Sequence, residues 1–147
     1  MTSLAALGLP FSIPVAPTPL PAPVRLIGNE ALATELQLPR NLWNGPDATE
    51  LLAGNRAWPD YGARATAYAG HQFGRYTRQL GDGRALLIAE IETPAGPREL
   101  QLKGAGPTPY ARGADGRAVL RSSIREYLAS EAMDALGVPT TRALSLV

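Results

Sequence analysis

Hydrophobic and polar positions follow regular patterns in the second half of the chain. A run of five apolar residues at 85–89 predicts a buried strand within Arg84–Glu92. Residues Glu99–Lys103 alternate between polar and apolar types and predict a half-buried strand. The segment Thr93–Pro97 between them has the composition of a turn. Together these patterns predict an antiparallel hairpin, with Lys103 near the end of its second strand.

A helical period follows a loop rich in glycine and proline at 104–116. The apolar residues at helical spacing are Leu120, Ile124, Leu128, Ala132, Ala135 and Leu136. They predict a helix that Gly137-Val138-Pro139 ends. Ser123 and Glu126 have the spacing of a capping box, although the helix could begin before them. Residues 140–147 have the pattern of a strand that has just begun, so we expect a truncated domain.

The first part of the chain is dominated by proline. Residues 1–24 contain six prolines, a spacing that forbids a helix and favours an extended arm, either free or packed on the domain. Several apolar residues support the alternative of an arm packed on the domain: Leu4, Leu7, Leu9, Phe11 and Ile13. Asn29 is a candidate N-cap for a short helix over Glu30–Leu38, ended by Pro39.

The segment between the arm and the regular patterns gives weaker signals. Asp47-Ala-Thr-Glu50 has the form of a capping box for another short helix, with Gly54-Asn55 as its stop. Residues 56–80 show little period, and no element is predicted there. We expect their aromatic side chains in the core or packed under loops: Tyr61, Tyr68, Phe73 and Tyr76. His71 is expected to be structural, because no nucleophile or carboxylate lies near it in the sequence.

Composition narrows the classes of function. The chain has 147 residues, 45% of them hydrophobic, which suits one domain with a modest core. It has no cysteine and a single histidine, which excludes disulfides, iron–sulfur clusters and multi-histidine metal sites. A net charge of +1 gives no reason to expect nucleic acid or a membrane as partner. Because neither a secretory signal nor a long apolar run is present, we expect a cytoplasmic protein.

One lysine stands out among thirteen arginines. The chain order is a glycine-rich turn at Gly81-Asp82-Gly83, a strand, a strand with Lys103, a loop and a helix with Glu126. Such an order can cradle a triphosphate, because glycines let backbone N–H groups approach anionic oxygens and a lysine adds positive charge. Most turns of the Gly-Asp-Gly type are nevertheless plain hairpin turns. No helix neighbour of Glu126 is basic, so its partner is either Lys103 or, within a capping box, Ser123.

Three arginines also share a spacing. Arg117, Arg121 and Arg125 fall at positions i, i+4 and i+8, which would form one basic line on a helix. The line could face phosphate, but structural salt bridges are the more common use of such arginines. Without a matching overall positive charge, the line is weak support for nucleic-acid binding.

Long blocks of the chain are similar to one known family. They are Tyr68–Gly74 (YAGHQFG), Gln79–Ala85 (QLGDGRA), Glu99–Tyr110 (ELQLKGAGPTPY), Ala114–Leu128 (ADGRAVLRSSIREYL), Ser130–Met133 and Leu136–Leu146. These blocks resemble the selenoprotein O family (SelO, YdiU) from about residue 17 onward. They correspond to the N-terminal part of that family's protein.

The resemblance implies an α+β fold, the protein-kinase-like N-lobe, with an antiparallel sheet and an equivalent of the kinase C-helix. Residues 1–24 would be the proline-rich arm, and 25–147 the N-lobe with its short helices, truncated before the C-lobe. The family is described as pseudokinases that bind ATP in a flipped orientation. They are nucleotidyltransferases (protein adenylyltransferases) that transfer AMP to Ser, Thr or Tyr hydroxyls of protein substrates.

The resemblance also implies roles for individual residues. The nucleotide-binding residues would be Gly81, Gly83 and Arg84 in the turn, Lys103 on the strand, and Asp115 and Gly116 in the loop. Lys103 would contact phosphate, and Glu126 would be its ion-pair partner. In AMP transfer the α-phosphorus reacts, so Lys103 and Arg84 would neutralise the leaving or bridging oxygens.

The match ends before the family's catalytic aspartate, its ligands for Mg²⁺ or Mn²⁺ and two further phosphate-contacting arginines. No residue here corresponds to them, so we expect these 147 residues alone to be inactive. Two departures, Arg75–Arg78 and Gly113, put the local loop shape in doubt. The alternatives are a non-catalytic fragment that binds nucleotide or protein, and a conventional kinase that transfers the γ-phosphoryl group.

Overall fold

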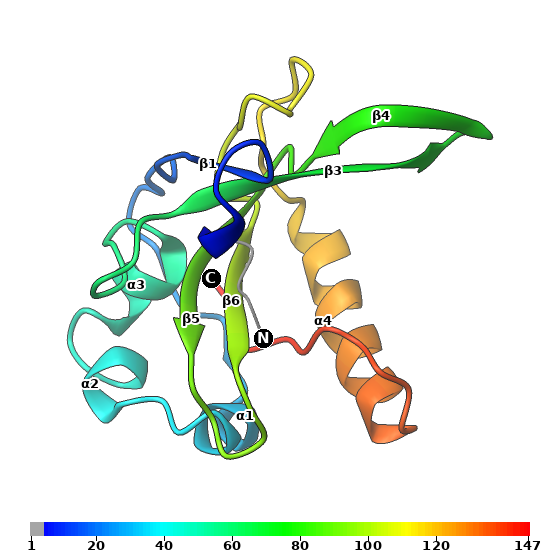
Figure 1. The fold of residues 1–147 in the computed structure, drawn as a ribbon. Coiled ribbons are helices and arrows are strands. Elements are labelled where there is room, and N and C mark those ends of the chain that lie inside the picture. The colour runs from blue at the N-terminus through cyan, green and yellow to red at the C-terminus, as the bar shows by residue number, and fades with distance from the viewer. Residues whose placement is uncertain (1–4) are drawn as a thin grey trace.

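An antiparallel β-sheet forms the centre of the molecule in the computed structural model, which describes residues 5–147. Its five strands are β1 (Ser12–Pro14), β3 (Arg64–Gln72), β4 (Arg75–Gly81), β5 (Ala85–Ile91) and β6 (Arg98–Lys103). The strand order is β1-β3-β5-β6, and β4 pairs with β3. Figure 1 shows the short helices on one side of β5 and β6 and a long helix, α4, on the other. The expected α+β class with an antiparallel sheet is confirmed.

The predicted hairpin is β5 with β6, and its boundaries lie within one residue of the expected ones. Ala85 pairs with Lys103, and the register continues to Ile91 opposite Arg98, with a shift between Leu87 and Ala89. The apolar centre of β5 is buried, as the continuous hydrophobic run predicted. Leu86, Ile88 and Ala89 of this strand pack in one core with residues of the short helices and loops: Ala33, Trp43, Leu52, Trp58 and Ala105.

A second hairpin, β3 with β4, occupies the segment for which no element was predicted. Figure 1 shows it extending away from the rest of the molecule. Only the base of β3 is buried, at Ala65 and Thr66. The expectation that the aromatic residues of this segment lie in the core or pack under loops is wrong for Phe73, which is 97% exposed, and for Tyr68 and Tyr76, which are at least half exposed. Without a buried face the outer part has no alternating pattern, and backbone pairing alone defines it.

Three short helices precede this hairpin. Helix α1 spans Glu30–Glu35, and Asn29 caps it as predicted, its Oδ1 accepting a hydrogen bond of 3.0 Å from the Leu32 N–H. The helix ends before the expected Leu38, because Gln37 has a φ of 52° and turns the backbone. Helix α2, Arg40–Trp43, then begins immediately after Pro39 and was not predicted.

Helix α3 spans Ala48–Ala53 and ends at Gly54 as predicted, with a φ of 79° that favours glycine. The predicted capping box is wrong, because the Asp47 side chain makes no cap hydrogen bond. It forms an ion pair with Arg56 instead. The Glu50 carboxylate accepts a hydrogen bond from Asn55 Nδ2 at 2.8 Å.

Helix α4 spans Leu120–Ala135 and begins three residues before Ser123. The Ser123–Glu126 capping box is therefore wrong, and Ser123 Oγ donates to the Val119 carbonyl within the helix. Arg117 precedes the helix, so the predicted helical line of three arginines does not form. No residue of α4 is buried, although its apolar positions have helical spacing. The helical spacing of apolar residues correctly predicted the helix, but these residues are not buried.

The proline-rich segment lies along the sheet. After a short 3-10 helix, η1 (Ala5–Leu7), Ser12–Pro14 pairs with Arg64–Thr66 of β3. Further on, Thr18 N–H donates to the Ala105 carbonyl at 2.8 Å, and Leu20 N–H donates to Asn55 Oδ1 at 2.7 Å. Residues 1–4 of the expected arm, with Leu4, lie outside the described residues.

The end of the chain forms a second, two-stranded sheet. Strand β7 (Ser145–Leu146) pairs antiparallel with β2 (Ile27–Gly28), so the strand expected within 140–147 is present but short. Within residues 5–147, no helix combines the length and the apolar character needed to cross a membrane.

Candidate functional site

Lys103 and Glu126 form an ion pair between the sheet and helix α4. The Lys103 Nζ atom lies 2.5 Å from Glu126 Oε1 and 2.7 Å from Oε2. Of the two partners considered for Glu126, the structure shows the lysine. Both side chains are about half exposed, at 46% and 55%, so the pair contributes at most about 1 kcal/mol to folding. An exposed ammonium group held in this way is also accessible to a ligand.

The strand pattern explains the direction of the Lys103 side chain. Along β6, Leu100 and Leu102 pack against the core cluster. Successive side chains of a strand point to opposite faces, so Lys103 points away from the core. Helix α4 lies on that side, where Glu126 reaches it (Figure 1).

The turn at Gly81-Asp82-Gly83 is fixed by its neighbours. Thr66 Oγ1 donates to Asp82 Oδ2 at 2.5 Å, and Thr108 Oγ1 donates to the Asp82 carbonyl at 2.6 Å. A Cβ at Gly81 would lie 2.3 Å from the Tyr110 ring, and one at Gly83 would lie 3.0 Å from the Tyr110 carbonyl. Both positions therefore favour glycine, because a larger side chain would collide with Tyr110. Sequence reasoning missed Thr108 and Tyr110, because their loop offered only turn-forming residues as a signal.

The loop that contains Asp115 and Gly116 folds back onto the end of the hairpin. The Gly106 N–H donates to the Gly116 carbonyl at 3.2 Å. Gly116 has a φ of 69°, and a Cβ there would lie 2.0 Å from the Gly106 carbonyl carbon, so only glycine fits. Asp115 Oδ1 accepts a hydrogen bond from the Arg117 N–H at 2.9 Å, which shapes the turn.

Arg117 connects this loop to the N-terminal segment. Its guanidinium donates to the carbonyls of Thr18, Pro19 and Gly104 at 3.1 to 3.3 Å. Its own carbonyl accepts a hydrogen bond from Arg84 Nη1 at 3.3 Å. The predicted salt bridges are wrong for this residue, because backbone carbonyls take the place of carboxylates. Within residues 5–147, Arg121 and Arg125 form no ion pair either.

The predicted site residues thus lie around one feature, the loop that joins β6 to α4. Hydrogen bonds connect it to the turn through Gly83 and Arg84, whose carbonyls accept from Thr108 N–H at 3.3 Å and Gly104 N–H at 2.8 Å. Lys103 begins the loop, and Glu126 follows it on α4. The loop therefore connects Lys103 and Glu126 to the turn that contains Gly81, Gly83 and Arg84.

A second cluster anchors the C-terminal half of α4, and sequence reasoning missed it. Arg142 makes two hydrogen bonds to the Glu131 carboxylate, at 3.0 and 2.8 Å. The same carboxylate accepts hydrogen bonds from Asn29 Nδ2 and the Ala143 N–H. Arg142 also contacts Asp134 at 2.9 Å. These contacts hold α4 to α1 and to the chain end, so they fix the helix that presents Glu126.

The hydrogen bonds of this cluster shift its ionisation. The hydrogen bonds from Arg142 hold the pKa of Glu131 below its usual value of 4.5, with further help from Ala143 and Asn29 and against partial burial. The same contact with Glu131 raises the pKa of Arg142. Burial, and then the Glu131 charge, raise the pKa of Tyr127.

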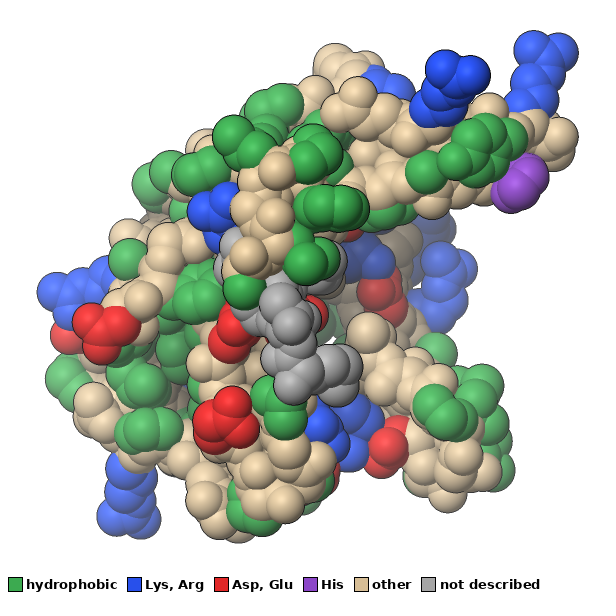
Figure 2. All heavy atoms as spheres, viewed as in Figure 1, with side chains coloured by type: hydrophobic (Ala, Val, Ile, Leu, Met, Phe, Trp, Pro, Cys, Tyr) green, Lys and Arg blue, Asp and Glu red, His purple; other side chains and the backbone are tan. Residues whose placement is uncertain are grey.

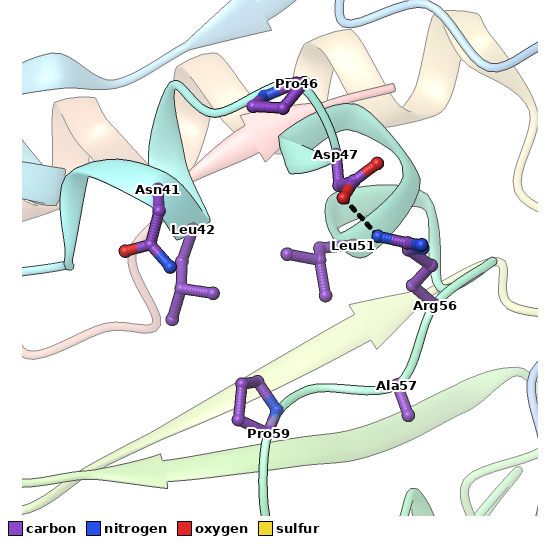
Figure 3. Close-up of a pocket in the computed structure, with 8 residues that line it drawn as sticks. All are labelled: Asn41, Leu42, Pro46, Asp47, Leu51, Arg56, Ala57 and Pro59. Carbon is purple, nitrogen blue, oxygen red and sulfur yellow. Dashed lines mark hydrogen bonds and ion pairs between the residues drawn. The ribbon is translucent and has the colours of Figure 1, made fainter.

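A cavity lies away from this cluster, beside helices α2 and α3. Figure 3 shows this cavity of about 530 Å³, with Leu42 and Leu51 facing each other and the Asp47–Arg56 pair at one side. None of the predicted nucleotide-binding residues lines it. The candidate site itself is built from exposed or half-exposed side chains, among them Lys103, Glu126 and Arg84. Within residues 5–147, no group of three or more His, Cys, Asp or Glu side chains is placed to hold a metal ion.

The chain is similar to known proteins. The family model described as Protein adenylyltransferase SelO matches residues 1–147. A relative from Methylococcus capsulatus, named Protein nucleotidyltransferase YdiU, is 68% identical over 142 residues, covering 96% of this chain and 28% of the relative. Relatives of the same name from Dechloromonas aromatica and Cupriavidus pinatubonensis are each 54% identical, covering 99% and 100% of this chain and 29% and 28% of theirs.

These relatives are named as nucleotidyltransferases. The chain belongs to the SelO family, as its sequence blocks predicted. It spans less than a third of the length of the curated relatives it matches.

Proposed function

We propose that this chain is the ATP-binding, kinase-like N-lobe of a protein adenylyltransferase, which transfers AMP from ATP to Ser, Thr or Tyr hydroxyls of protein substrates. The observation that carries the proposal is the Lys103–Glu126 pair between strand and helix. Protein kinases use a strand lysine and a helix glutamate in this way to hold a nucleotide phosphate. Membership of the SelO family supports the choice of AMP as the group transferred.

Lys103 would supply positive charge to the triphosphate. Its ammonium group is held by both carboxylate oxygens of Glu126, so its position is set before a ligand arrives. A charge that is already in place costs little reorganisation when negative charge develops on a leaving group. Arg84, exposed just before β5, would add a second positive group. Gly81, Gly83, Asp115 and Gly116 would form the wall of the same site.

The proposed reaction breaks one bond at phosphorus and forms another. The acceptor hydroxyl oxygen attacks the α-phosphorus, the bond to the bridging oxygen breaks, and pyrophosphate leaves with its electron pair. The hydroxyl proton passes to a carboxylate base that we expect in another part of the family's protein. Lys103 and Arg84 would neutralise the oxygens of the departing pyrophosphate.

A divalent metal ion is expected with ATP, as Mg²⁺ or Mn²⁺. The described residues offer it no cluster of carboxylates, so we assign no step of the reaction through the ion to this chain. Its ligands are expected in another part of the family's protein.

The test separates binding from transfer. Calorimetry measures ATP affinity for the 147-residue chain, its Lys103→Ala variant and Arg98→Ala, a matched control on the same strand. We expect Lys103→Ala to weaken ATP binding about tenfold or more, because it removes a charged contact to phosphate, and Arg98→Ala to leave affinity unchanged. Equal affinity for all three proteins would refute the role of Lys103.

A full-length version tests the transfer itself. Incubated with protein substrates, it should pass label from ATP marked on the α-phosphate and not from ATP marked on the γ-phosphate. Label passing only from the γ-phosphate would mean a conventional kinase. ATP binding without either label would mean a non-catalytic nucleotide-binding protein.

A further inference from the structure

The β3–β4 hairpin projects beyond the domain that it belongs to (Figure 1). Its base is tied to β1 over Arg64–Thr66 and to β5 at Arg64. Beyond Ala67 the two strands pair with each other, and the outer edge of β4 has no neighbouring strand within residues 5–147. A hydrogen bond of 2.9 Å from Arg112 Nη1 to Gln72 Oε1 links the hairpin to the loop of the candidate site. Since only Ala65 and Thr66 at the base of β3 are buried, the outer hairpin contributes little to the core of this domain.

Phe73 forms the tip of this hairpin in an unfavourable conformation. The two-residue loop Phe73-Gly74 has positive φ at both positions, 51° and 77°, which is the pattern of a type I′ turn. Asn-Gly is the preferred pair there, and a bulky residue at positive φ is strained. The Phe73 ring is also 97% exposed. Neither local conformation nor packing within this chain accounts for an aromatic residue at the tip.

The surroundings of Phe73 are aromatic and basic. Tyr76 and Tyr68 are at least half exposed, and His71 contacts the Tyr76 ring edge-on at 5.4 Å between centroids. The side chains of Arg75 and Arg78 are exposed and form no hydrogen bond or ion pair within the described residues. No residue from Tyr61 to Gly81 is acidic, so nothing on the hairpin neutralises them. Figure 2 shows basic and hydrophobic side chains and the histidine together near the tip.

This combination is the composition of a protein interface. Exposed tyrosine, phenylalanine and arginine are enriched at the centres of protein–protein contacts, where a few of them carry most of the affinity. The unneutralised arginines call for carboxylates on the partner. A nucleic-acid partner is less well matched, because the chain has a net charge of only +1.

We propose that the tip of the β3–β4 hairpin is a docking surface for an acidic protein segment, with Phe73 as the apolar anchor and Arg75 and Arg78 as its electrostatic contacts. The partner would present aromatic or aliphatic side chains among glutamates or aspartates. The proposal does not depend on ATP, so it can fail while the nucleotide site stands. The nucleotide site can likewise fail while the docking surface stands.

The test uses a fluorescently labelled random copolymer of glutamate and tyrosine as the probe. It is titrated with the 147-residue chain, and binding is followed by fluorescence anisotropy. We expect the double variant Arg75→Glu/Arg78→Glu to bind about tenfold more weakly or worse, and Phe73→Ala about fivefold more weakly. Binding of the unaltered chain should weaken as salt is added.

The matched control is Arg40→Glu/Arg98→Glu, which makes the same change of charge at two exposed arginines away from the hairpin. It should leave affinity within about twofold of the unaltered chain. An equal loss in this control would overturn the proposal, because net charge alone would then explain binding. Thermal unfolding of each variant shows that the folded state is being compared.

Two other occupants are distinguished by the same proteins. Oligothymidylate that binds more tightly than the copolymer, and loses affinity in the hairpin variants, would assign the tip to nucleic acid. Self-association that Phe73→Ala abolishes would assign it to a second copy of the chain. Either result would overturn the proposal of an acidic protein partner.

Discussion

The two hairpins of the sheet are built from the same kind of pairing but differ in what their side chains do. In β5–β6 one strand is buried, with Leu87 only 2% exposed, and the side chains define the element. In β3–β4 the outer half buries nothing, and the element exists because two strands pair with each other. Sequence patterns report burial, so they found the first hairpin and missed the second. In an element without a buried face, side chains are free to serve purposes other than folding.

Replacing Leu87 by Ala should give the largest effect. The substitution leaves a cavity at this buried position of β5 and should lower the free energy of unfolding by about 3 kcal/mol. Urea unfolding measures it as a lower midpoint at constant slope. Tyr68→Ala, on the outer hairpin, is the control and should change stability by no more than about 0.5 kcal/mol. A larger loss for Tyr68 than for Leu87 would reverse the distinction drawn between the hairpins.

Gly81 lies where the two hairpins meet, and its substitution should rank second. A Cβ there would lie 2.3 Å from the Tyr110 ring, so Gly81→Ala should cost about 2 kcal/mol. Gly70→Ala on the same hairpin is the control, because its Cβ would only touch Leu80 Cδ1 at 3.4 Å.

A double-mutant cycle with Tyr110→Ala identifies the cause of this loss. The double variant should lose less than the sum of the single losses, because removing the ring relieves the collision. Additive losses would mean that Gly81 is needed for another reason. In that case the packing explanation of the turn would be wrong.

The third effect in size is a loss of stability in acid, because low pH should weaken the Glu131–Arg142 contact that holds α4. Since the folded pKa of Glu131 lies below 4.5, its contribution to stability is present above that pH and is lost as the pH falls through the lower, folded value. Glu131→Gln should cost about 1 to 2 kcal/mol at neutral pH and flatten this part of the pH profile.

Glu126→Gln is the comparison for that measurement, because its carboxylate also pairs with a basic side chain but is more than half exposed. We expect a loss of about 0.5 kcal/mol, in keeping with an exposed pair. Unfolding midpoints from pH 3 to 7 measure both variants. An unchanged slope in Glu131→Gln would contradict the assignment.

What the sequence allowed us to predict follows the same division. Asn29, Gly54 and the β5–β6 strands were predictable because each signal is local, a cap, a stop or a buried run. The candidate pairing of Lys103 with Glu126 came from excluding partners within the helix and from the family resemblance.

The errors have a common cause. The Ser123–Glu126 capping box does not form because α4 begins before Ser123 and Glu126 pairs with Lys103, and the Asp47 side chain pairs with Arg56 instead of capping α3. The salt bridges expected for Arg117 do not form, because its partners are carbonyls of an arm about a hundred residues away. Such partners are fixed by the tertiary fold, and a local pattern in the sequence carries no information about them.

The smallest effect is also the one that separates the hairpins most sharply. Phe73→Asn places a residue that tolerates positive φ at the tip, so the chain should become more stable by about 0.5 kcal/mol while it loses affinity for the acidic copolymer. Phe73→Ala is the control, because it removes the same ring without favouring positive φ, and it should lose affinity without the gain in stability. Urea unfolding and anisotropy on the same samples measure the two quantities. If Phe73→Asn destabilised the chain, the ring would have a structural role and the tip would resemble β5. A gain in stability together with a loss of binding would show that Phe73 serves a partner at the expense of its own fold.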